Sequence, residues 1–294
     1  MGSVESYEIA GGRRYLVRYR SPEKRQVKER GFTTKLAAKQ RLAEIEVAKA
    51  RGAFVDPASG MTTVGGLGPA WLEAQRGFLK PSSFRPLESA WRIHVAPRWG
   101  DVQLRDIRFS AVQLWITSLN DRLSPTMVKR CLGILSGILE TAVRDRLIHA
   151  NACIGVKTPH KVPKSRVYLN HQQVRALAAQ CGDRSTLVLV MAYTGLRWGE
   201  AIALRVRDVN FDRRRLQVDQ NAVEVGDTIH VGTPKSHERR SVAFPETLTG
   251  DIAAATAGKG PDDLLFPGRD GQHLRRTRSN AGSSGWFAGA VRRD

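Results

Sequence analysis

The stretch TGLRWGEAIAL, residues 194–204, joins two apolar segments through a glycine and places an arginine and a glutamate at the junction. The segment before it, STLVLVMAYTG, predicts a buried helix that ends at Gly195, because glycine readily adopts the left-handed conformation found just past a helix end. The apolar spacing after Gly195 predicts a second helix, with Arg197 at its start and Glu200 one turn later. Helix N-termini favour anions, so this elbow is a candidate anion site.

Two interpretations of the elbow stay open on these residues alone. Arg197 and Glu200 could form an ordinary surface ion pair, since residues three apart on a helix are neighbours. Alternatively, Glu200 orients the guanidinium while Arg197 binds a phosphate. A second cation, Lys235, lies further on in the predicted turn TPKSHE, although an exposed loop lysine is equally ordinary. Two cations on separate elements suit a phosphate whose negative charge grows during a displacement.

Regular patterns flank the elbow on both sides. Asn170 and Gln173 have the spacing of a capping box, which predicts that a helix begins at residue 171. After the elbow the hydrophobic period changes to two, which predicts strands in RRLQVDQNAVEV and in TIHVGTPKSHERRSVAF, with a turn at Gly226-Asp227 between them. The second half of the chain is therefore expected to be mixed α/β.

The charge of the chain indicates a polyanionic partner. The 294 residues carry 47 Lys and Arg against 28 Asp and Glu, a formal net charge of +19. The excess is spread evenly: residues 1–60 hold 13 basic and 7 acidic residues, 61–160 hold 13 and 7, and 161–294 hold 21 and 14. Such a spread suggests several domains along one duplex DNA. A basic protein without this partner is the alternative.

The cysteine and hydropathy patterns exclude several other classes. Three widely spaced cysteines, Cys131, Cys153 and Cys181, contain no CxxC pair, which argues against disulfide frameworks and zinc fingers and fits a reducing cytoplasm. No His-Glu-x-x-His spacing or glycine-rich fingerprint occurs, so neither a metal nor a nucleotide cofactor is expected. The longest apolar run is too short to cross a bilayer, so no membrane association is expected.

The N-terminal segment predicts a small sheet followed by a helix. In RRYLVRYR, aromatic and aliphatic residues alternate with cations, so Arg14, Arg18 and Arg20 share one face with Leu16. These arginines are candidate DNA contacts, or else charges that protect an edge strand from aggregation. A helix from 35 to 51 follows the N-cap candidate Thr34.

Helical patterns dominate the middle of the chain, after a Gly- and Pro-rich stretch at 52–70 that we interpret as a linker. The patterns predict a helix around Trp71, a second over 86–95, a third with Ser110 as its N-cap, and a fourth with Ser124 as N-cap and Pro125 at the first position. Trp91 and Trp115 are expected in the core. The connector 155–166 is basic, and its candidate phosphate contacts are Lys157, Lys161 and Lys164.

Taken in order, AYTGLRWGEAIALRVRDVNFDRRRLQV, TPKSHERRSVAF and DDLLFPGRDG resemble the catalytic domain of tyrosine recombinases of the phage integrase type. The preceding helices are similar to that family's core-binding domain, and the N-terminal sheet and helix resemble its arm-type DNA-binding domain. The resemblance implies a multidomain, mainly α fold with small β elements. It places an arm-type domain at 1–60, a four-helix core-binding domain at 61–158 and a partial mixed α/β catalytic domain at 166–294.

The same resemblance implies roles for three residues and a reaction. Arg197 matches the arginine that clamps the scissile phosphate, Glu200 the acidic residue that supports it, and Lys235 the lysine that protonates the leaving 5′ oxygen. A tyrosine attacks the DNA phosphodiester and forms a 3′-phosphotyrosyl intermediate, so no metal or cofactor takes part. Expected partners are duplex DNA at core and arm-type sites, further copies of the chain on DNA, and a DNA-bending or directionality factor.

The chain departs from the family at its C-terminal end. In the family, an H-x-x-R pair and the nucleophilic tyrosine follow the residues that match LLF at 264–266, which we call the LF segment. Here the last tyrosine is Tyr193, which lies in the apolar helix. His273 and Arg276 fall too early to be that pair. We therefore expect a C-terminally truncated recombinase that is inactive by itself. The alternatives are a non-catalytic DNA-binding protein, such as a prophage remnant or site competitor, and an unrelated RNA-binding or transcription factor.

Overall fold

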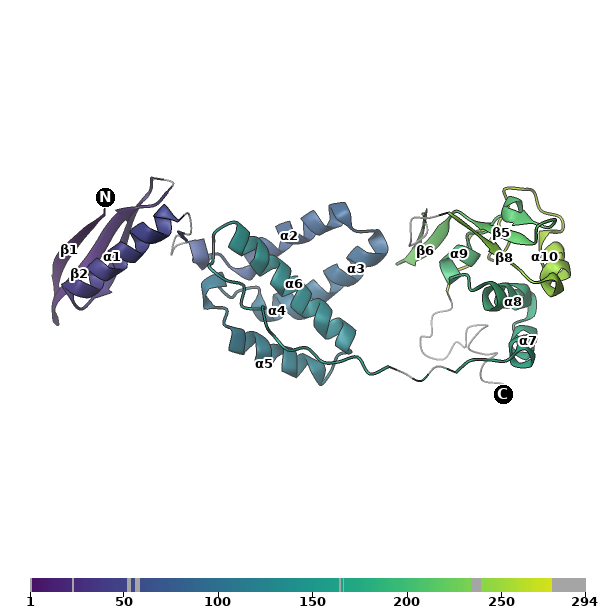
Figure 1. The fold of residues 1–294 in the computed structure, drawn as a ribbon, viewed down its shortest axis with the longest axis horizontal. Helices are drawn as coiled ribbons and strands as arrows, with labels where there is room; N and C mark the ends of the chain where they lie inside the picture. The colour runs from purple at the N-terminus through teal and green to yellow at the C-terminus, as the bar shows by residue number, and fades with distance from the viewer. Residues whose placement is uncertain are drawn as a thin grey trace. The chain divides into compact units, whose positions relative to one another are not determined.

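The computed structural model describes residues 2–22, 24–51, 54–55, 59–163, 165, 167–233 and 239–276. The chain forms two compact units, residues 1–162 and 163–294, which run from purple to teal and from teal to yellow in Figure 1. Both units are mainly helical with small antiparallel sheets, as the sequence predicts.

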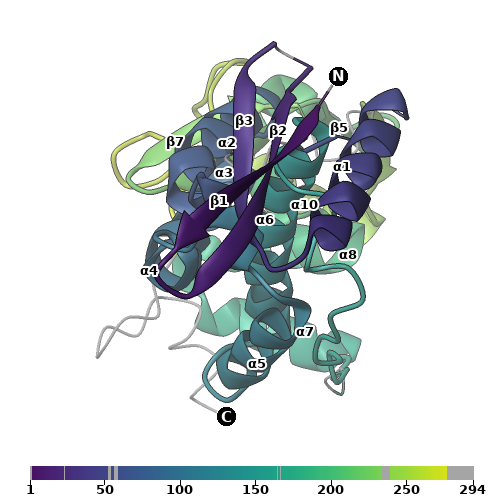
Figure 2. The same ribbon diagram turned by 90° about the vertical axis from the view of Figure 1, so that its left-hand side faces the viewer.

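The first unit opens with a three-stranded antiparallel sheet and one helix (Figures 1 and 2). The strand order is β1-β2-β3. The elements are β1 (Ser3–Ile9), β2 (Gly12–Arg20), β3 (Gln26–Phe32) and α1 (Lys35–Ala50). The predicted N-cap of α1 is confirmed, because the Thr34 hydroxyl accepts a hydrogen bond from the Ala37 amide.

One face of this sheet packs on α1 and buries a small core. Val17 and Tyr19 of β2 meet Ala38 and Ile45 of the helix, and all four are buried. The Tyr19 hydroxyl donates to the carboxylate of Glu29, which also accepts from Arg41 of α1. The polar tip of a buried tyrosine is thereby satisfied, and the helix is fixed to β3. The other face of the sheet carries no helix.

Helices make up the rest of the first unit around one continuous core. They are α2 (Val64–Phe78), α3 (Pro81–Ala90), a π-helical turn (Trp91–Val95), α4 (Ala96–Trp99), α5 (Phe109–Asn120) and α6 (Pro125–Arg144), with 3-10 turns at Ser59–Met61 and Leu104–Asp106. Trp91 and Trp115 are buried in this core, as predicted. Trp115 packs edge to face on Trp99, with ring centroids 5.7 Å apart.

The predicted linker at 52–70 is wrong in its second half, because α2 already begins at Val64. Two glycines of this stretch, Gly65 and Gly68, allow α2 to pack closely on neighbouring residues. The Gly65 amide donates to the Gly100 carbonyl at 2.8 Å, and a Cβ at Gly65 would lie only 2.8 Å from that oxygen. A Cβ at Gly68 would lie 2.2 Å from the Trp91 ring. Composition alone cannot separate glycines that let backbones approach from glycines that loosen a loop.

Two other predicted helix starts are also displaced. The helix expected over 86–95 begins at Pro81 and continues through the π-helical turn to Trp99, so Pro86 lies inside it. The helix expected to begin after Ser110 has Arg108 as its N-cap. α3 packs against both α6 and α2, and α5 packs against α6, so tertiary packing stabilises both helices beyond their local signals. The start of α6 is confirmed, since the Ser124 hydroxyl caps it and Pro125 is its first residue.

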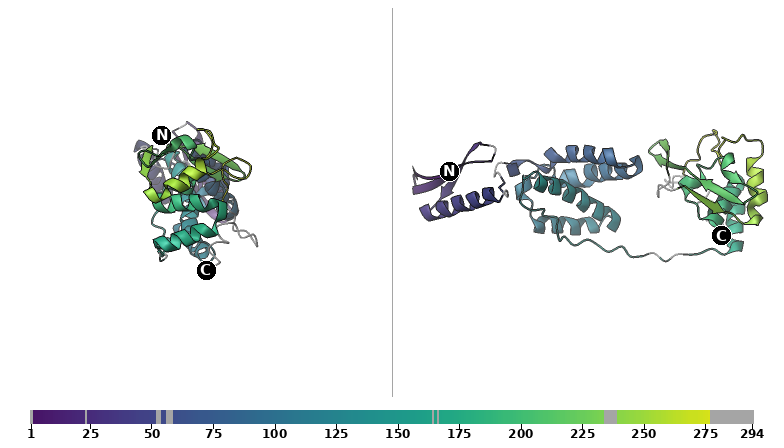
Figure 3. Two further views of the ribbon diagram at one scale, coloured as in Figure 1. Left: turned by 90° about the vertical axis from the view of Figure 1, so that its right-hand side faces the viewer. Right: turned by 45° about the horizontal axis from the view of Figure 1, so that its top comes forward.

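In its described residues, the second unit combines four α-helices with two small sheets, part of which can be followed in Figure 3. The helices are α7 (His171–Gln180), α8 (Ser185–Thr194), α9 (Trp198–Ala201) and α10 (Thr249–Thr256), with 3-10 turns at Gly182–Arg184, Val206–Asp208 and Glu246–Leu248. The strands are β4 (Val209–Asn210), β5 (Arg215–Val218), β6 (Asn221–Val225), β7 (Thr228–Gly232) and β8 (Arg240–Ala243). The predicted capping box of Asn170 and Gln173 is present at the start of α7.

The second helix of the elbow is much shorter than its sequence predicts. α9 ends at Ala201, Ile202 and Ala203 form a turn, and the backbone is no longer helical at Leu204. The Leu204 carbonyl accepts from the Leu265 amide, and Arg205 pairs with Leu264 in an isolated bridge. These pairings with the LF segment, distant in the chain, outweigh local helix propensity.

The strands pair differently from a simple meander. β6 and β7 form a separate hairpin around the predicted Gly226-Asp227 turn. β8 skips this hairpin and pairs with β5, so the second sheet has the order β4-β5-β8. As a result, the N-terminal end of β8 lies beside the C-terminal end of β5, where Val218 faces Arg240.

Two glycines of α6 should respond oppositely to alanine. A Cβ at Gly137 would lie 2.5 Å from the Trp71 ring of α2, so Gly137→Ala should lower the free energy of unfolding by about 1–3 kcal/mol through overpacking. At Gly133 a Cβ would meet nothing within 4 Å, so Gly133→Ala should raise stability by roughly 0.5–1 kcal/mol through helix propensity. Urea unfolding of both variants measures this; a gain at Gly137 would contradict the packing.

Candidate functional site

The elbow of residues 194–204 has the geometry that the sequence predicts at its first turn. α8 ends at Thr194, and Gly195 follows it in the left-handed conformation, with φ of 66°. The chain then turns through Leu196 into extended backbone at Arg197, which is the N-cap residue of α9. Arg197 therefore lies at the start of a helical turn, on a bend that a glycine makes possible.

The carboxylate of Glu200 is the centre of the site. It is 1% exposed, and each of its oxygens accepts two hydrogen bonds. Oε1 accepts from Nη1 of Arg197 at 3.0 Å and from Nη1 of Arg240 at 3.0 Å. Oε2 accepts from the Arg197 backbone amide at 2.9 Å and from Nη2 of Arg240 at 2.7 Å. A buried carboxylate is tolerated only when it is paired in this way.

These contacts decide the protonation of Glu200. Burial by itself raises the pKa, but hydrogen bonds from Arg240 and Arg197 outweigh it and hold the pKa at about 2. The carboxylate is consequently ionised at neutral pH. The same contact raises the pKa of Arg240 above its ordinary value. One negative charge is therefore shared by two permanent cations, which leaves the cluster with a net positive charge.

The two arginines differ in how much of each faces solvent. The side chain of Arg197 is 60% exposed, and only its Nη1 is hydrogen-bonded to Glu200. The side chain of Arg240 is 34% exposed and directs both terminal nitrogens at the carboxylate. Toward the described residues, the other side-chain N–H donors of Arg197 make no hydrogen bond and can meet an external anion, whereas Arg240 is turned inward. Sequence reasoning missed Arg240, although it stands in the same TPKSHERRSV stretch as Lys235.

The other predicted residues of this region lie outside the cluster or outside the described residues. Lys235 lies outside the described residues. His273 forms an isolated bridge with Pro267, and burial and the nearby Arg205 lower its pKa. The Arg276 amide donates to Glu224 of β6. Within the described part of the chain, neither His273 nor Arg276 has a recorded hydrogen bond or ion pair with Arg197, Glu200 or Arg240, so the structure does not bring them into this cluster.

Tyr193, the last tyrosine, is half-buried and packs against the core of the second unit. Its ring stacks on His171 of α7, with centroids 5.6 Å apart and planes 10° apart. The three cysteines are buried, and burial raises the thiol pKa of Cys131 to about 11 and that of Cys153 to about 12, which makes both unreactive. Among the described residues no His, Cys, Asp and Glu cluster could hold a metal, and no helix could span a membrane.

Comparisons with known proteins agree with the sequence motifs. Residues 167–288 match the family described as the phage integrase family. The prophage phiRv2 integrase of Mycobacterium tuberculosis (strain ATCC 25618 / H37Rv) is 30% identical over 203 residues, which cover 67% of this chain and 53% of that protein. The integrase of Mycobacterium phage D29 is 27% identical over 197 residues, or 63% of this chain and 52% of that protein. This chain is a member of the tyrosine recombinase family.

Solved integrase structures share the fold of this recombinase-family chain. The Tn1549 transposon integrase in complex with a circular intermediate DNA superposes with a TM-score of 0.62 at 20% identity, covering 72% of this chain and 73% of that one. A lambda integrase tetramer bound to a Holliday junction gives 0.59 at 13% identity, covering 92% and 79%. The chain spans about half the length of the curated relatives it matches.

The chain also presents cations on the open face of its N-terminal sheet. Arg14, Arg18 and Arg20 alternate along β2 on the face opposite α1. Arg18 pairs with Glu5 of β1 at 2.8 Å, and Arg20 is exposed. The register adds two exposed residues of β3 that sequence reasoning missed, because Lys28 lies opposite Arg18 and Arg30 lies opposite Leu16. Leu16, expected to face outward, is buried on this face.

The basic connector is partly fixed to the helices of the first unit. The Lys157 amide donates to Oε1 of Gln113 at 2.8 Å, and Nε2 of Gln113 donates back to the Lys157 carbonyl at 3.2 Å. The Lys157 side chain is exposed, as is that of Lys161. Lys164 lies outside the described residues. The connector is thus held at its first lysine by α5.

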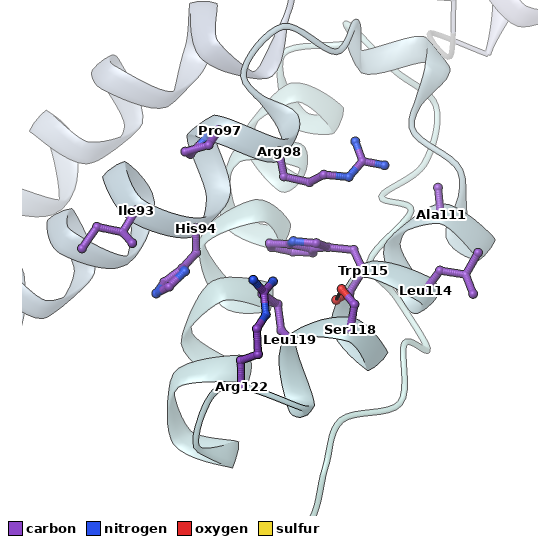
Figure 4. A pocket seen from close by; sticks show the side chains of 10 residues that line it. All are labelled: Ile93, His94, Pro97, Arg98, Ala111, Leu114, Trp115, Ser118, Leu119 and Arg122. Carbon is purple, nitrogen blue, oxygen red and sulfur yellow. Dashed lines mark hydrogen bonds between the residues drawn. The ribbon is translucent and has the colours of Figure 1, made fainter.

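A hollow of about 570 Å³ opens between the π-helical turn, α4 and α5. Figure 4 shows Trp115 at its centre, with Arg98 on one side and Arg122 on the other, and His94 nearby. No carboxylate lines it. Its lining combines apolar residues with the two arginines and His94.

Proposed function

We propose that this chain binds duplex DNA and acts in site-specific recombination, the cleavage and rejoining of DNA strands through a 3′-phosphotyrosyl intermediate. The observation that carries the proposal is the exposed guanidinium of Arg197, fixed from behind by the buried carboxylate of Glu200. A guanidinium with free donors can clamp a phosphodiester in two parallel hydrogen bonds. Because Glu200 already fixes its position, little reorganisation is needed when negative charge develops on the phosphate.

The proposed roles follow from chemistry and from the family motifs. Arg197 binds the scissile phosphate, Glu200 orients Arg197, and Lys235 protonates the leaving 5′ oxygen. The covalent link to a tyrosine would conserve the energy of the phosphodiester, so we propose that neither metal nor cofactor takes part. The lambda integrase structure holds a tetramer on a Holliday junction, and we propose that this chain likewise associates with itself on DNA, in the cytoplasm. A DNA-bending or directionality factor is proposed as a further partner.

We propose three parts with separate contacts to DNA, residues 1–60, 61–158 and 166–294. The first uses the open face of its sheet, where Lys28 and Arg30 add to Arg14, Arg18 and Arg20. The second is a four-helix core-binding domain, followed by the connector lysines Lys157, Lys161 and Lys164. The third carries the Arg197 cluster. The spread of positive charge over all three segments supports this division.

For a polypeptide of these 294 residues we propose phosphate binding without the covalent step. All five tyrosines lie at or before Tyr193, whose ring is stacked on His171. Donors that stabilise charge cannot form an adduct without a nucleophile. We propose a non-catalytic role, as an occupant of recombination sites or a competitor for them, as the second candidate function.

The DNA-binding role of the open sheet face can be tested by removing two positive charges from that face and, as a control, two from α1. Lys28→Ala with Arg30→Ala should weaken binding to duplex DNA and reduce the slope of log affinity against log salt by roughly 1–2, because each lost phosphate contact releases one counterion fewer. The matched control, Lys35→Ala with Lys39→Ala, removes exposed charges from α1. Fluorescence anisotropy at several salt concentrations gives the slopes; equal slopes for the two pairs would rule out a DNA-binding sheet face.

Removal of the proposed clamp should affect DNA more than folding. Arg197→Ala leaves Glu200 with both bonds from Arg240 and the bond from the residue-197 backbone amide, so the chain should still fold, with the free energy of unfolding lowered by about 1–3 kcal/mol. Footprints on duplexes selected by wild type from a random pool should lose protection at one phosphate per bound half-site. The control is Arg214→Ala, which breaks the exposed ion pair between Arg214 and Glu246 in the same unit. It should keep the full footprint. An unchanged Arg197→Ala footprint would favour the plain ion-pair interpretation.

The 294-residue polypeptide should leave DNA unmodified. Duplexes from the same selection, nicked at successive positions to trap cleavage products, should give no band that resists denaturation in electrophoresis. The physical reason is the lack of a tyrosine after Tyr193. An adduct would overturn this expectation, and peptide mapping of the linked tyrosine would identify the nucleophile.

A further inference from the structure

We propose that Arg240 is a positioning residue for Arg197, acting through the buried carboxylate of Glu200 to keep the free donors of Arg197 turned toward a phosphate. This inference rests on the proposed phosphate-binding role of Arg197. It adds a residue from a different element, because Arg240 begins β8 whereas Arg197 and Glu200 belong to the elbow at α9.

The geometry shows how one arginine can fix another. Each oxygen of Glu200 accepts one bond from Arg240 and one from Arg197 or its backbone amide. The two terminal nitrogens of Arg240, at 3.0 and 2.7 Å, grip the carboxylate as a fork and set its plane. A carboxylate with a fixed plane presents Oε1 to Nη1 of Arg197 from one direction only. Arg240 thus restricts Arg197 without touching it.

The unequal use of donors assigns the two roles. Both terminal nitrogens of Arg240 donate hydrogen bonds to Glu200, and its side chain is 34% exposed. Only one terminal nitrogen of Arg197 donates to Glu200, and its side chain is 60% exposed. If the arginines were equivalent, either could meet a phosphate. As they stand, Arg197 faces outward to the anion and Arg240 faces the carboxylate.

Arg240 is also needed to keep Glu200 ionised. Among the described residues, the charged groups that interact with Glu200 are Arg197 from its own turn and Arg240 from β8. α8 contains no charged residue, and β6 brings the neutral Asn221 against the adjacent Gly199. Without Arg240, burial would be opposed by Arg197 alone, so the pKa of Glu200 would rise. A protonated Glu200 would lose its charge-assisted hold on Arg197.

The sign of the pH dependence follows from this. In the wild-type chain the pKa of Glu200 is about 2, so the carboxylate is ionised from mildly acidic to neutral pH and phosphate affinity should be flat over that range. In Arg240→Met the raised pKa brings titration into the measurable range. Above that pKa Glu200 is ionised and still holds Arg197. As pH falls through it, the hold is lost and affinity should drop.

The experiment uses the full ¹⁵N,¹³C-labelled chain and dimethyl phosphate, a phosphodiester that stays a monoanion over this range. NMR follows the Arg197 Nε–H resonance as dimethyl phosphate is added, and the Glu200 carboxyl carbon as pH is varied. Arg240→Met should bind roughly tenfold more weakly at acidic pH, the effect of one charge-assisted hydrogen bond. Arg240→Lys, which keeps the charge but not the fork, should restore part of the affinity. Arg214→Met removes an arginine paired with Glu246 at 2.7 Å and should behave as wild type.

The outcomes separate this inference from the proposed function. A flat pH profile and unchanged affinity in Arg240→Met would overturn the positioning role, as would a Glu200 carboxyl that stays ionised in that variant. If wild type binds no dimethyl phosphate while Glu200 titrates in Arg240→Met, the phosphate role of Arg197 fails and the coupling of the two arginines stands. Should Arg240→Met unfold, Arg240→Lys carries the test, with a smaller shift in the same direction.

Discussion

A single buried carboxylate holds the candidate site together. Glu200 is enclosed by α9 and the strand that follows a distant hairpin, and it is stable there only because two guanidinium groups and a backbone amide satisfy it. Those same bonds fix where Arg197 can lie. The requirement to compensate a buried charge and the placement of a phosphate-binding group are thus one physical constraint.

The fold supplies this constraint by strand pairing. β8 pairs with β5 and leaves β6 and β7 as a separate hairpin, which brings Arg240 to the elbow although forty residues separate it from Glu200. The LF segment ends α9 after one turn by pairing with Leu204 and Arg205. A longer helix would satisfy the same local propensity, but Leu204 and Arg205 could then no longer pair with Leu265 and Leu264.

In the first unit, close contact between backbones and tryptophans has the same organising role. Gly65, Gly68 and Gly137 lie where a side chain would strike Gly100, Trp91 or Trp71. These contacts set how α2 packs on α6 and on the helix that carries Trp91. They also account for the helical conformation of a glycine-rich stretch that by composition is typical of a linker.

Local signals were sufficient for much of the structure. The sequence by itself determined the N-caps at Thr34, Ser124 and Asn170, the stop at Gly195, the Gly226-Asp227 turn and the Arg197–Glu200 pair, because each depends on residues within a few positions. Only the tertiary structure decided the pairing of β8 with β5, the short α9, the burial of Leu16 and the second arginine on Glu200. Those features depend on contacts between residues far apart in the chain, where packing and the cost of an unpaired buried charge outweigh local propensity.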